Sequence, residues 1–428
     1  MLHRLLVFCL FILPALRLSA QQDSAYSVEK MQRAVSFAAL TLGGDVFMKT
    51  GGTTTLPGDG TSRKFAPSAM PRFTIGGLHF WGHADFYVTF PLPLNIGGKT
   101  AGFSKIRSFE VVETGARVYP WAIRPGKLRP FAGISFQPLV YRQKIENQDY
   151  GKGEATYDRW ITPLHAGLTY ASKNYLFTLG AQYNRRTDFS YYATATQQTP
   201  VKINPWSFQF AILRYMDTDK GMGSTRSVRI HNYLEKKLLE KNKMSAWYYG
   251  YGPSTALQLS KSPYLKANAP YLYDESSTSF LAPDLSFGRY FSRIDANVGL
   301  SYRWFGNRQR AFDSDLRSHR HSLALEGYKF LFNYHGFAPF LGGFVSAERL
   351  SLKHNAERHI DYKPAAGLVF GWDIRVTRTQ SGYLRTNLRW APGLHLDVNG
   401  QQYKFDHLEF NFIQMVKYIG RNKFYKTL

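Results

Sequence analysis

The sequence has very little of three things. Its one cysteine, Cys9, lies in an N-terminal segment that we expect to be removed, so the mature chain would have no disulfide and no cysteine-based metal site. Ionisable residues, Gly or Pro interrupt every apolar stretch, which argues against a transmembrane helix of about 20 apolar residues. Acidic residues are scarce, with 30 Asp and Glu against 54 Lys and Arg, and the formal net charge is +24.

The N-terminus has the pattern of a secretory signal peptide. Arg4 precedes an apolar run over residues 5–16, and the small residues Ser19 and Ala20 follow it. A basic flank, a short apolar stretch and a small residue before the cut are the marks of such a peptide. We therefore predict that residues 1–20 are cleaved and that the rest of the chain is exported.

The positive charge does not indicate nucleic acid. Lys and Arg are scattered through predicted loops and strand ends, and the sequence contains no nucleic-acid-binding motif. Phosphates of lipopolysaccharide are a more natural counter-charge, because Arg and Lys donate charge-assisted hydrogen bonds to phosphate oxygens. We expect outer-membrane lipid, lipopolysaccharide and other envelope proteins as partners, and we expect no cofactor.

Aromatic residues and glycine are abundant. With 28 Tyr, 32 Phe and 36 Gly, the composition favours many short strands separated by turns and fits the aromatic girdles of a transmembrane barrel. Residues 83–92 alternate, with Phe86 and Val88 on one face and Asp85 and Tyr87 on the other. A soluble all-β protein would show the same alternation, so the loop lengths must decide between the two.

The connections between the predicted strands alternate between long and short. In the first half the long ones lie near residues 49–69, 93–106, 144–158 and 188–204, and the tight turns lie near 81–82, 121–127 and 172–173. Long loops on one rim and tight turns on the other are typical of an outer-membrane barrel and not of a Greek-key sandwich. The predicted strands of this half cover residues 34–48, 70–80, 83–92, 107–120, 128–143, 159–171, 174–187 and 205–216.

The second half repeats this pattern. Residues 129–136 match 338–345, residues 165–170 match 365–370, and residues 206–210 match 408–412, all in the same order. Three matches in register indicate an internal duplication. The predicted strands of this half cover residues 246–260, 280–291, 294–305, 320–333, 337–353, 362–374, 382–395 and 406–418.

One motif carries a family resemblance. The sequence Gly115-Ala-Arg-Val-Tyr-Pro-Trp121 is followed by a short turn and then by Pro130-Phe-Ala-Gly133. With this motif, each half resembles the small eight-stranded outer-membrane barrels of the OmpA, OmpX and OmpW type. The resemblance covers most of the mature chain and implies an antiparallel transmembrane β-barrel in the outer membrane of a Gram-negative bacterium. It carries over no functional residue.

We predict an all-β protein of two tandem eight-stranded barrels, over residues 21–216 and 245–428. Residues 217–244 form a charged linker, with Ile230, Leu234 and Leu238 on one face of a predicted periplasmic helix. The alternative is one sixteen-stranded barrel in which this linker is a long turn. An eight-stranded transmembrane barrel is filled by its side chains, whereas about sixteen strands leave an aqueous channel.

Five charged residues are predicted to point into the barrel interiors. They are Asp85, Glu113 and Arg117 in the first half, and Asp295 and Arg303, which are predicted to share one inward strand face, in the second. Because an isolated buried charge is costly, charges inside a filled barrel must pair. We interpret them as an internal salt-bridge network, and a gated polar path through the barrel is the functional alternative.

A lipid A-modifying enzyme is a further alternative. Such chemistry needs a nucleophile, a base and an orienting acid within hydrogen-bond reach, and Ser135, His83 and Asp85 form the best candidate set. No Gly-x-Ser-x-Gly motif accompanies them, so we predict that the protein is not an enzyme.

The remaining histidines form two loose groups, His319 with His321 and His354 with His359. A His-x-His pair can bind a metal, but no acidic residues accompany these pairs at a fixed spacing. We interpret both groups as exposed histidines in or beside surface loops and predict no metal site.

The predicted function is a structural, adhesive or assembly-partner role in the outer membrane, carried by the surface loops. A porin-like channel for small solutes is the main alternative, and it corresponds to the sixteen-stranded barrel.

Overall fold

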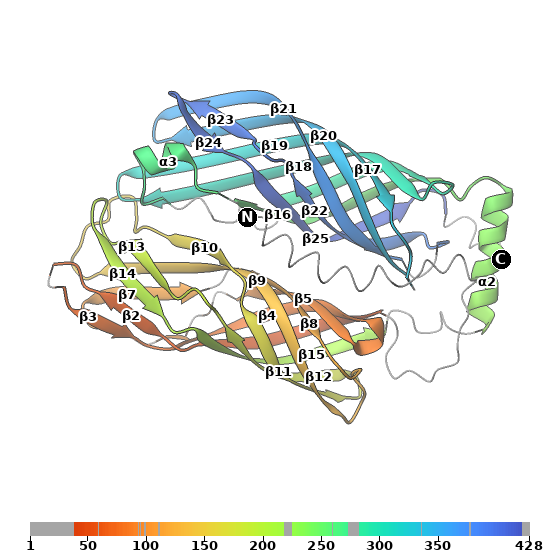
Figure 1. Ribbon diagram of the computed structural model, residues 1–428, viewed down its shortest axis with the longest axis horizontal. Helices are drawn as coiled ribbons and strands as arrows, with labels where there is room; N and C mark the ends of the chain where they lie inside the picture. Colours follow the sequence, from red (N-terminus) through yellow and green to blue (C-terminus); the bar gives the residue numbers. More distant parts are fainter. Residues whose placement is uncertain are drawn as a thin grey trace.

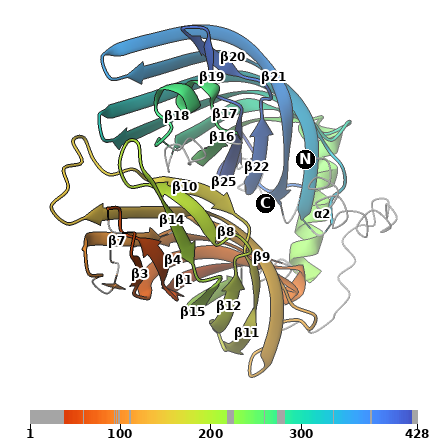
Figure 2. The same cartoon turned by 60° about the vertical axis from the view of Figure 1, so that its left-hand side comes forward.

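The computed structural model describes residues 38–421 apart from 59, 93, 95, 98–99, 110–111, 218–224, 259, 273–281, 335 and 376–377. These residues form two antiparallel β-barrels that lie side by side, with their long loops at the same end (Figure 1, Figure 2). The predicted signal peptide lies outside the described residues.

The first barrel closes on itself through its first strand. β1 (Ala38–Lys49) pairs with β4 on one side over its whole length and with β15 on the other side from Ala39 to Lys49. The remaining pairings complete a ring of eight strands. After β1 these strands are β4 (Ser68–His79), β5 (Ala84–Pro91), β8 (Glu113–Val118), β9 (Leu128–Ile145), β11 (Leu164–Ser172), β12 (Tyr175–Tyr183) and β15 (Trp206–Asp217).

The second barrel closes in the same way. β16 (Ala246–Gln258) pairs with both the next strand, β17, and the last strand, β25. Among the described residues no strand of one ring pairs with a strand of the other, so the chain does not form a single sixteen-stranded barrel. The other strands of this ring are β17 (Ala282–Phe291), β18 (Ala296–Ala311), β19 (Ser314–Phe330), β20 (Phe337–His354), β21 (Glu357–Ile374), β22 (Gly382–Trp390) and β25 (His407–Tyr418).

Alternation along the strands separates an apolar outer wall from a polar interior. In β15, Phe208 and Phe210 are exposed on the outside, whereas Gln209 and Ala211 between and beside them are buried inside. Apolar side chains exposed on the outer walls of both barrels form the belt that a transmembrane barrel presents to lipid. Further members of this belt are Leu42, Val46, Ile134, Leu168, Leu179, Phe287, Leu300, Leu325, Val345, Leu368 and Met415.

The two barrels meet through their apolar outer faces. Val88 on β5 packs in one cluster with Phe412 on β25, and the rings of Phe86 and Trp372 lie 6.3 Å apart. Nearer the tight turns, the ring of Phe80 lies 5.6 Å from that of Phe337. Each barrel therefore covers a part of the other that would otherwise face lipid.

The strand predictions needed two kinds of correction. The predicted strand 107–120 is divided into β7 (Phe103–Phe109) and β8, and the predicted strand 159–171 into β10 (Tyr157–Ile161) and β11. Pro163 lies in the second break, where it has no N–H to donate to a neighbouring strand. In the second barrel, β18 and β19 extend over residues 306–311 and 314–319, which were expected to belong to a loop.

The long loops have secondary structure of their own. A four-stranded sheet in the order β13-β14-β2-β3 lies at the loop end of the first barrel. The loop end of the second barrel carries a short helix and a hairpin (Figure 1). These elements are β2 (Gly52–Thr55), β3 (Ser62–Phe65), β13 (Asp188–Tyr192), β14 (Gln198–Ile203), α3 (Pro263–Asn268), β23 (His395–Val398) and β24 (Gln401–Lys404), with a short β6 (Ile96–Gly97) beside β4.

The linker carries a helix, α2 (Thr225–Glu240), at the tight-turn end (Figure 1). Leu234 and Leu238 are buried, but Ile230, expected on the same face, is 39% exposed. His231 Nδ1 lies 2.8 Å from Thr379 Oγ1, so the helix contacts the rim of the second barrel. In the part of the chain that the structure describes, no helix has the length and apolar character needed to cross a bilayer.

The three matched sequence pairs occupy equivalent places in the two rings. Residues 129–136 and 338–345 lie in the fifth strand of each ring, β9 and β20. Residues 165–170 and 365–370 lie in the sixth, β11 and β21, and residues 206–210 and 408–412 in the eighth, β15 and β25. Corresponding sequence therefore forms corresponding strands.

Candidate functional site

Arg72 is the centre of a buried ion-pair network inside the first barrel. Its Nε and Nη2 donate to the two carboxylate oxygens of Asp45 at 2.6 and 3.0 Å, and its Nη1 donates to Glu113 Oε2 at 2.6 Å. All three side chains are at most 1% exposed. Because Asp45 is on β1, Arg72 on β4 and Glu113 on β8, the network connects three strands of the ring.

Arg117 forms a second centre in the same interior. Its Nη1 donates to Asp85 Oδ2 at 2.9 Å and its Nη2 to Gln209 Oε1 at 3.0 Å. The guanidinium also lies 4.1 Å from the ring centre of Tyr87. Gly115 makes room for that ring, since a Cβ there would lie 2.4 Å from Tyr87 Oη.

Glu113 connects the two centres through neutral groups. Tyr87 Oη donates to Glu113 Oε1 at 2.8 Å and also lies 3.1 Å from His165 Nδ1. Gln182 Nε2 donates to the same carboxylate oxygen at 2.9 Å. The structure thus places Asp85, Glu113 and Arg117 in one interior, with Asp85 and Arg117 in direct contact.

The second barrel has a larger network around Glu409. This carboxylate lies 2.9 Å from nitrogens of Arg303 and Arg320 and 2.8 Å from Arg389 Nε. Each arginine also contacts a carboxylate of its own, which places three buried cations among four buried carboxylates. These further contacts are Arg303 with Asp284 at 2.9 Å, Arg320 with Glu348 at 2.8 Å and Arg389 with Glu326 at 3.0 Å.

The sequence predicted that Asp295 and Arg303 both point into the barrel from one strand face. This prediction was wrong for Asp295. Asp295 lies in the tight turn before β18, with φ 47°, and its side chain is 32% exposed. Its carboxylate contacts Arg375 at 3.3 Å and accepts a hydrogen bond from Tyr290 Oη at 2.7 Å. β18 begins one residue later at Ala296, so strand alternation does not apply to Asp295.

Both interiors are filled. Apart from Glu326, whose side chain is 10% exposed, the charged side chains of the two networks are at most 1% exposed. Buried aromatic residues pack together nearer the tight turns of each barrel. These residues include Tyr119 and Phe131 in the first barrel and Tyr248, Tyr290, Tyr328, Phe330 and Tyr383 in the second.

The candidate catalytic set is not assembled. His83 is exposed in the turn before β5, where its Nδ1 lies 3.0 Å from the carbonyl oxygen of Tyr119. Asp85 is bound to Arg117, and the buried hydroxyl of Ser135 has no hydrogen-bond partner among the described residues. His83 precedes the first residue of β5, so its side chain does not follow Asp85 into the interior.

Sequence reasoning missed most members of the two networks. Asp45, Arg72, Arg320, Arg389 and Glu409 each lie within a predicted strand or at its first residue. A signal was available, because each is a charged residue on the polar side of an alternating strand. Which charges meet across a barrel depends on the registers of strands distant in sequence, and alternation alone does not supply these.

The loop ends of the two barrels share one hydrophobic core. It contains Tyr141, Tyr191 and Val201 from the first half, and Tyr271 and Leu396 from the second. The rings of Tyr192 and Tyr271 lie 6.3 Å apart across the two halves. We call the structure built on this core, made of the loop elements β2, β3, β13, β14, α3, β23 and β24, the cap.

Backbone contacts beside the cap also join the two halves. Lys152 N donates to the carbonyl oxygen of Phe312 at 2.7 Å, and Phe312 N donates to that of Gly153 at 2.8 Å. Lys152 Nζ donates to Asn355 Oδ1 at 2.7 Å. Asp313, beside this contact, accepts a hydrogen bond from Tyr271 Oη, which is the main reason why the pKa of its carboxyl is lowered.

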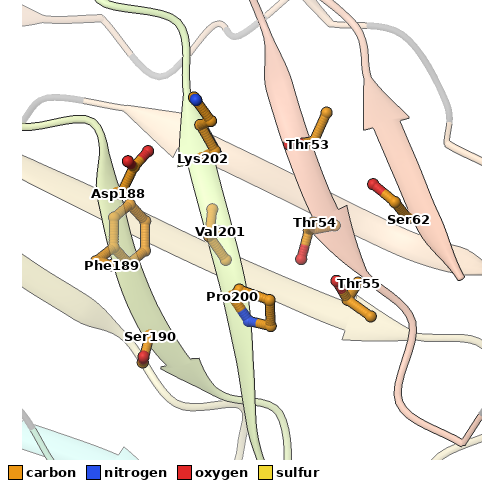
Figure 3. Close-up of a pocket in the computed structure, with 10 residues that line it drawn as sticks. All are labelled: Thr53, Thr54, Thr55, Ser62, Asp188, Phe189, Ser190, Pro200, Val201 and Lys202. Carbon is orange, nitrogen blue, oxygen red and sulfur yellow. The ribbon is translucent and has the colours of Figure 1, made fainter. Parts of the chain in front are cut away.

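The four-stranded sheet of the cap carries a hollow of about 570 Å³ (Figure 3). Strand register places Asp188, Lys202 and Thr53 in one row across β13, β14 and β2. Ser190 and Pro200, with Thr55 and Ser62, form the next row. The sheet faces the cap core on its other side, where Thr54 and Val201 are buried and Thr54 Oγ1 donates to Gln143 Oε1 at 2.9 Å.

This surface suits a polar ligand. Thr53, Thr55 and Ser62 present hydroxyl groups that can both donate and accept hydrogen bonds, while Asp188 only accepts and Lys202 only donates. The buried residues beneath this surface fix its conformation, so the site is preformed in the absence of a ligand. Within the described ranges, no three His, Cys, Asp or Glu side chains are grouped in a way that could hold a metal ion.

No family model and no curated protein matches this chain. Solved structures do resemble it. Neisserial surface protein A, at 14% identity, covers 41% of this chain and 96% of its own, with a TM-score of 0.28. Ail, the attachment invasion locus protein of Yersinia pestis, covers the same shares at 12% identity and TM-score 0.26. A loop-deletion mutant of OmpT, an outer membrane protein of Vibrio cholerae, covers 90% of this chain and 100% of its own at 9% identity and TM-score 0.18.

The assignment of the fold rests on this chain's own geometry. Each half is a closed ring of eight antiparallel strands with an exposed apolar belt and a buried polar interior. That architecture is the one of a transmembrane β-barrel of the outer-membrane type.

Proposed function

We propose that this protein is an adhesive protein of the outer membrane, whose two sealed barrels hold the cap at the cell surface. The observation that carries the proposal is that both interiors are filled by paired charges, while the loops above them form one ordered structure. A channel would need the opposite arrangement, with open lumens and loops that leave them accessible. The barrels therefore serve as an anchor, and binding is assigned to the loops.

The first expected result is that the protein does not conduct ions. In planar bilayers, the purified full chain should give no steady conductance steps, because ion-paired side chains occupy both interiors. A sixteen-stranded porin tested under the same conditions supplies the positive control. Large, steady steps from this protein would contradict the anchor role and favour the channel.

The hollow on the cap is the proposed binding surface, and an oligosaccharide is the proposed ligand. Sugars present many hydroxyl groups, which match hydroxyl side chains that donate and accept. Asp188 and Lys202 lie opposite each other in the strand register, and they would fix the orientation of a sugar as an acceptor and a donor. The carbon skeletons of Pro200 and the two threonines supply apolar contact beside these polar groups.

A glycan-array experiment tests this assignment. The detergent-solubilised full chain should bind a restricted set of oligosaccharides, and Thr53→Val combined with Lys202→Met should weaken that binding at least about tenfold, the equivalent of 1.4 kcal/mol. Two lost hydrogen bonds of ordinary strength account for this change. The matched control is Lys173→Met, which removes an exposed lysine from the tight turn between β11 and β12 and should leave binding unchanged. If the unmodified chain, the double variant and the control bind the oligosaccharides equally well, the hollow is not the binding surface.

A further inference from the structure

A second exposed surface lies on the outer wall of the second barrel, where β18 to β21 extend toward the cap. Strand register aligns Arg308, Arg317, Lys353 and Arg358 in one row across these four strands. Two rows closer to the membrane belt, the same registers align Trp304, His321, Arg349 and Tyr362. The residues between them in sequence, such as Ser318 and Arg320, are buried in the interior, so both rows point outward.

The charge on this surface is strongly unbalanced. Six cationic residues of these strands face outward, and Asp315 is the one carboxylate among the described residues that forms ion pairs with any of them. Asp315 contacts Arg308 at 2.6 Å, Arg310 at 3.4 Å and Arg317 at 3.5 Å. Among the described residues, no carboxylate lies within ion-pair distance of the other three, which are Arg349, Lys353 and Arg358. Mutual repulsion of these cations is costly unless an anion accompanies them.

The position of the six cations along the barrel shows which part of the membrane they contact. Leu323, Leu325 and Val345 lie on the same outer wall, closer to the tight turns, and are about half exposed, as lipid-facing residues are. Trp304 is 40% and Tyr362 71% exposed at the upper border of this apolar surface. Aromatic residues at such a border mark the interface between hydrocarbon and headgroups. Arg349 lies at this border, and the four cations of the upper row lie two rows further from the hydrocarbon, or about 13 Å at the usual rise per strand residue. Arg310 lies one row beyond them.

We propose that Arg308, Arg317, Arg349, Lys353 and Arg358 bind the phosphate groups of a phosphorylated glycolipid in the outer leaflet. Four arginines and a lysine in two nearby rows suit more than one phosphate, because each guanidinium can donate two parallel hydrogen bonds to phosphate oxygens. The acyl chains of the same lipid would cover Leu323 and Val345 directly below. The inference rests on the outer-membrane placement proposed above, but it requires neither a glycan ligand nor a sealed lumen.

The test compares two triple variants of the full chain that lose the same charge. Arg349→Gln, Lys353→Gln and Arg358→Gln remove the cations without a carboxylate partner. Arg107→Gln, Arg185→Gln and Arg186→Gln remove three exposed cations at the loop end of the first barrel, outside the hollow of the cap. Binding of purified lipopolysaccharide in an uncharged detergent is measured by native mass spectrometry, after heat-modifiable migration has shown that each variant is folded. Each lysine or arginine near a charged lipid surface contributes to the free energy of binding. The first triple variant, which loses three of them, is therefore expected to bind lipopolysaccharide about 100-fold more weakly.

Each outcome decides the proposal. Loss in the first triple with retention in the second supports it, provided that inorganic phosphate does not compete and that glycolipid stripped of its phosphates does not bind. Equal loss in both triples would show that net charge alone attracts the lipid, and retention in both would exclude the site. Competition by inorganic phosphate at equal concentration would assign the site to free phosphate and overturn the lipid. A failure here leaves the conductance and glycan results unaffected, so the two proposals fail separately.

Discussion

Replacing Arg72 with methionine is expected to lower the free energy of unfolding by about 3–5 kcal/mol, the usual cost of removing one partner from a buried ion pair. Arg72 is the cation that contacts both Asp45 and Glu113, at 2.6 Å each. Without it two carboxylates remain in an interior where they are fully buried. Urea unfolding of the full chain in detergent, followed by tryptophan fluorescence, measures the change.

Arg214→Met is the matched control for this prediction. Arg214 is exposed on the outer wall of β15, and the same substitution there should change stability by no more than about 0.5 kcal/mol. Combining Arg72→Met with Glu113→Gln should cost less than the sum of the single changes, because the two residues share one contact. Equal effects at Arg72 and Arg214, or full additivity, would mean that the Arg72 network does not stabilise the barrel.

Residues 21–220 expressed without the second half are expected to fold as a heat-modifiable monomer. The first barrel has no open edge, because β1 pairs with both β4 and β15. Every backbone group in lipid must be satisfied internally, and a closed ring of eight strands meets this requirement. Half of a sixteen-stranded barrel would leave two open edges and should aggregate. Refolding of the isolated half in detergent, with cold and heated samples compared on gels, gives the result.

The isolated half also provides a test of the contact between barrels. Phe86 and Val88, now covered by Trp372 and Phe412 of the second barrel, would face detergent. We therefore expect the half to fold but to unfold at lower denaturant concentration than the full chain. Aggregation of the half together with clean refolding of the full chain would contradict independent closure.

The sequence predicted most of the ring strands for a physical reason. Side chains that alternate between lipid and a polar interior give the sequence a two-residue period. The alternation of long and short connections shows at which rim of the barrel each connection lies. Asp85, Glu113 and Arg117 could be found because all three lie within the observed strands β5 and β8, where alternation applies. Asp295 could not be placed by the same argument, since it lies in the turn, directly before the first strand residue, Ala296.

Contacts between distant loops could not be predicted from local patterns. β2 pairs with β14 although Thr54 and Val201 are far apart in the sequence, and no period in either loop indicates this register. His319 and His321 were expected in or beside a surface loop, but they lie on β19, because that strand starts at Ser314. Polar residues continue the strands beyond the membrane belt, so the end of the apolar pattern does not coincide with the end of the strand.

Cross-linking of β1 to β15 tests most directly whether each half closes by itself. Val46 and Phe210 are directly opposite each other on these strands and both are exposed on the outer wall. Residues 21–428 contain no cysteine, so Val46→Cys with Phe210→Cys introduces one defined pair between β1 and β15. A second double variant, Phe210→Cys with Tyr251→Cys, places a pair on β15 and β16 instead. Two eight-stranded barrels predict that mild oxidation or a short bis-maleimide links the first pair in the membrane-inserted full chain and leaves the second unlinked. Efficient linking of β15 to β16, with none between β1 and β15, would show a single sixteen-stranded barrel and contradict the account.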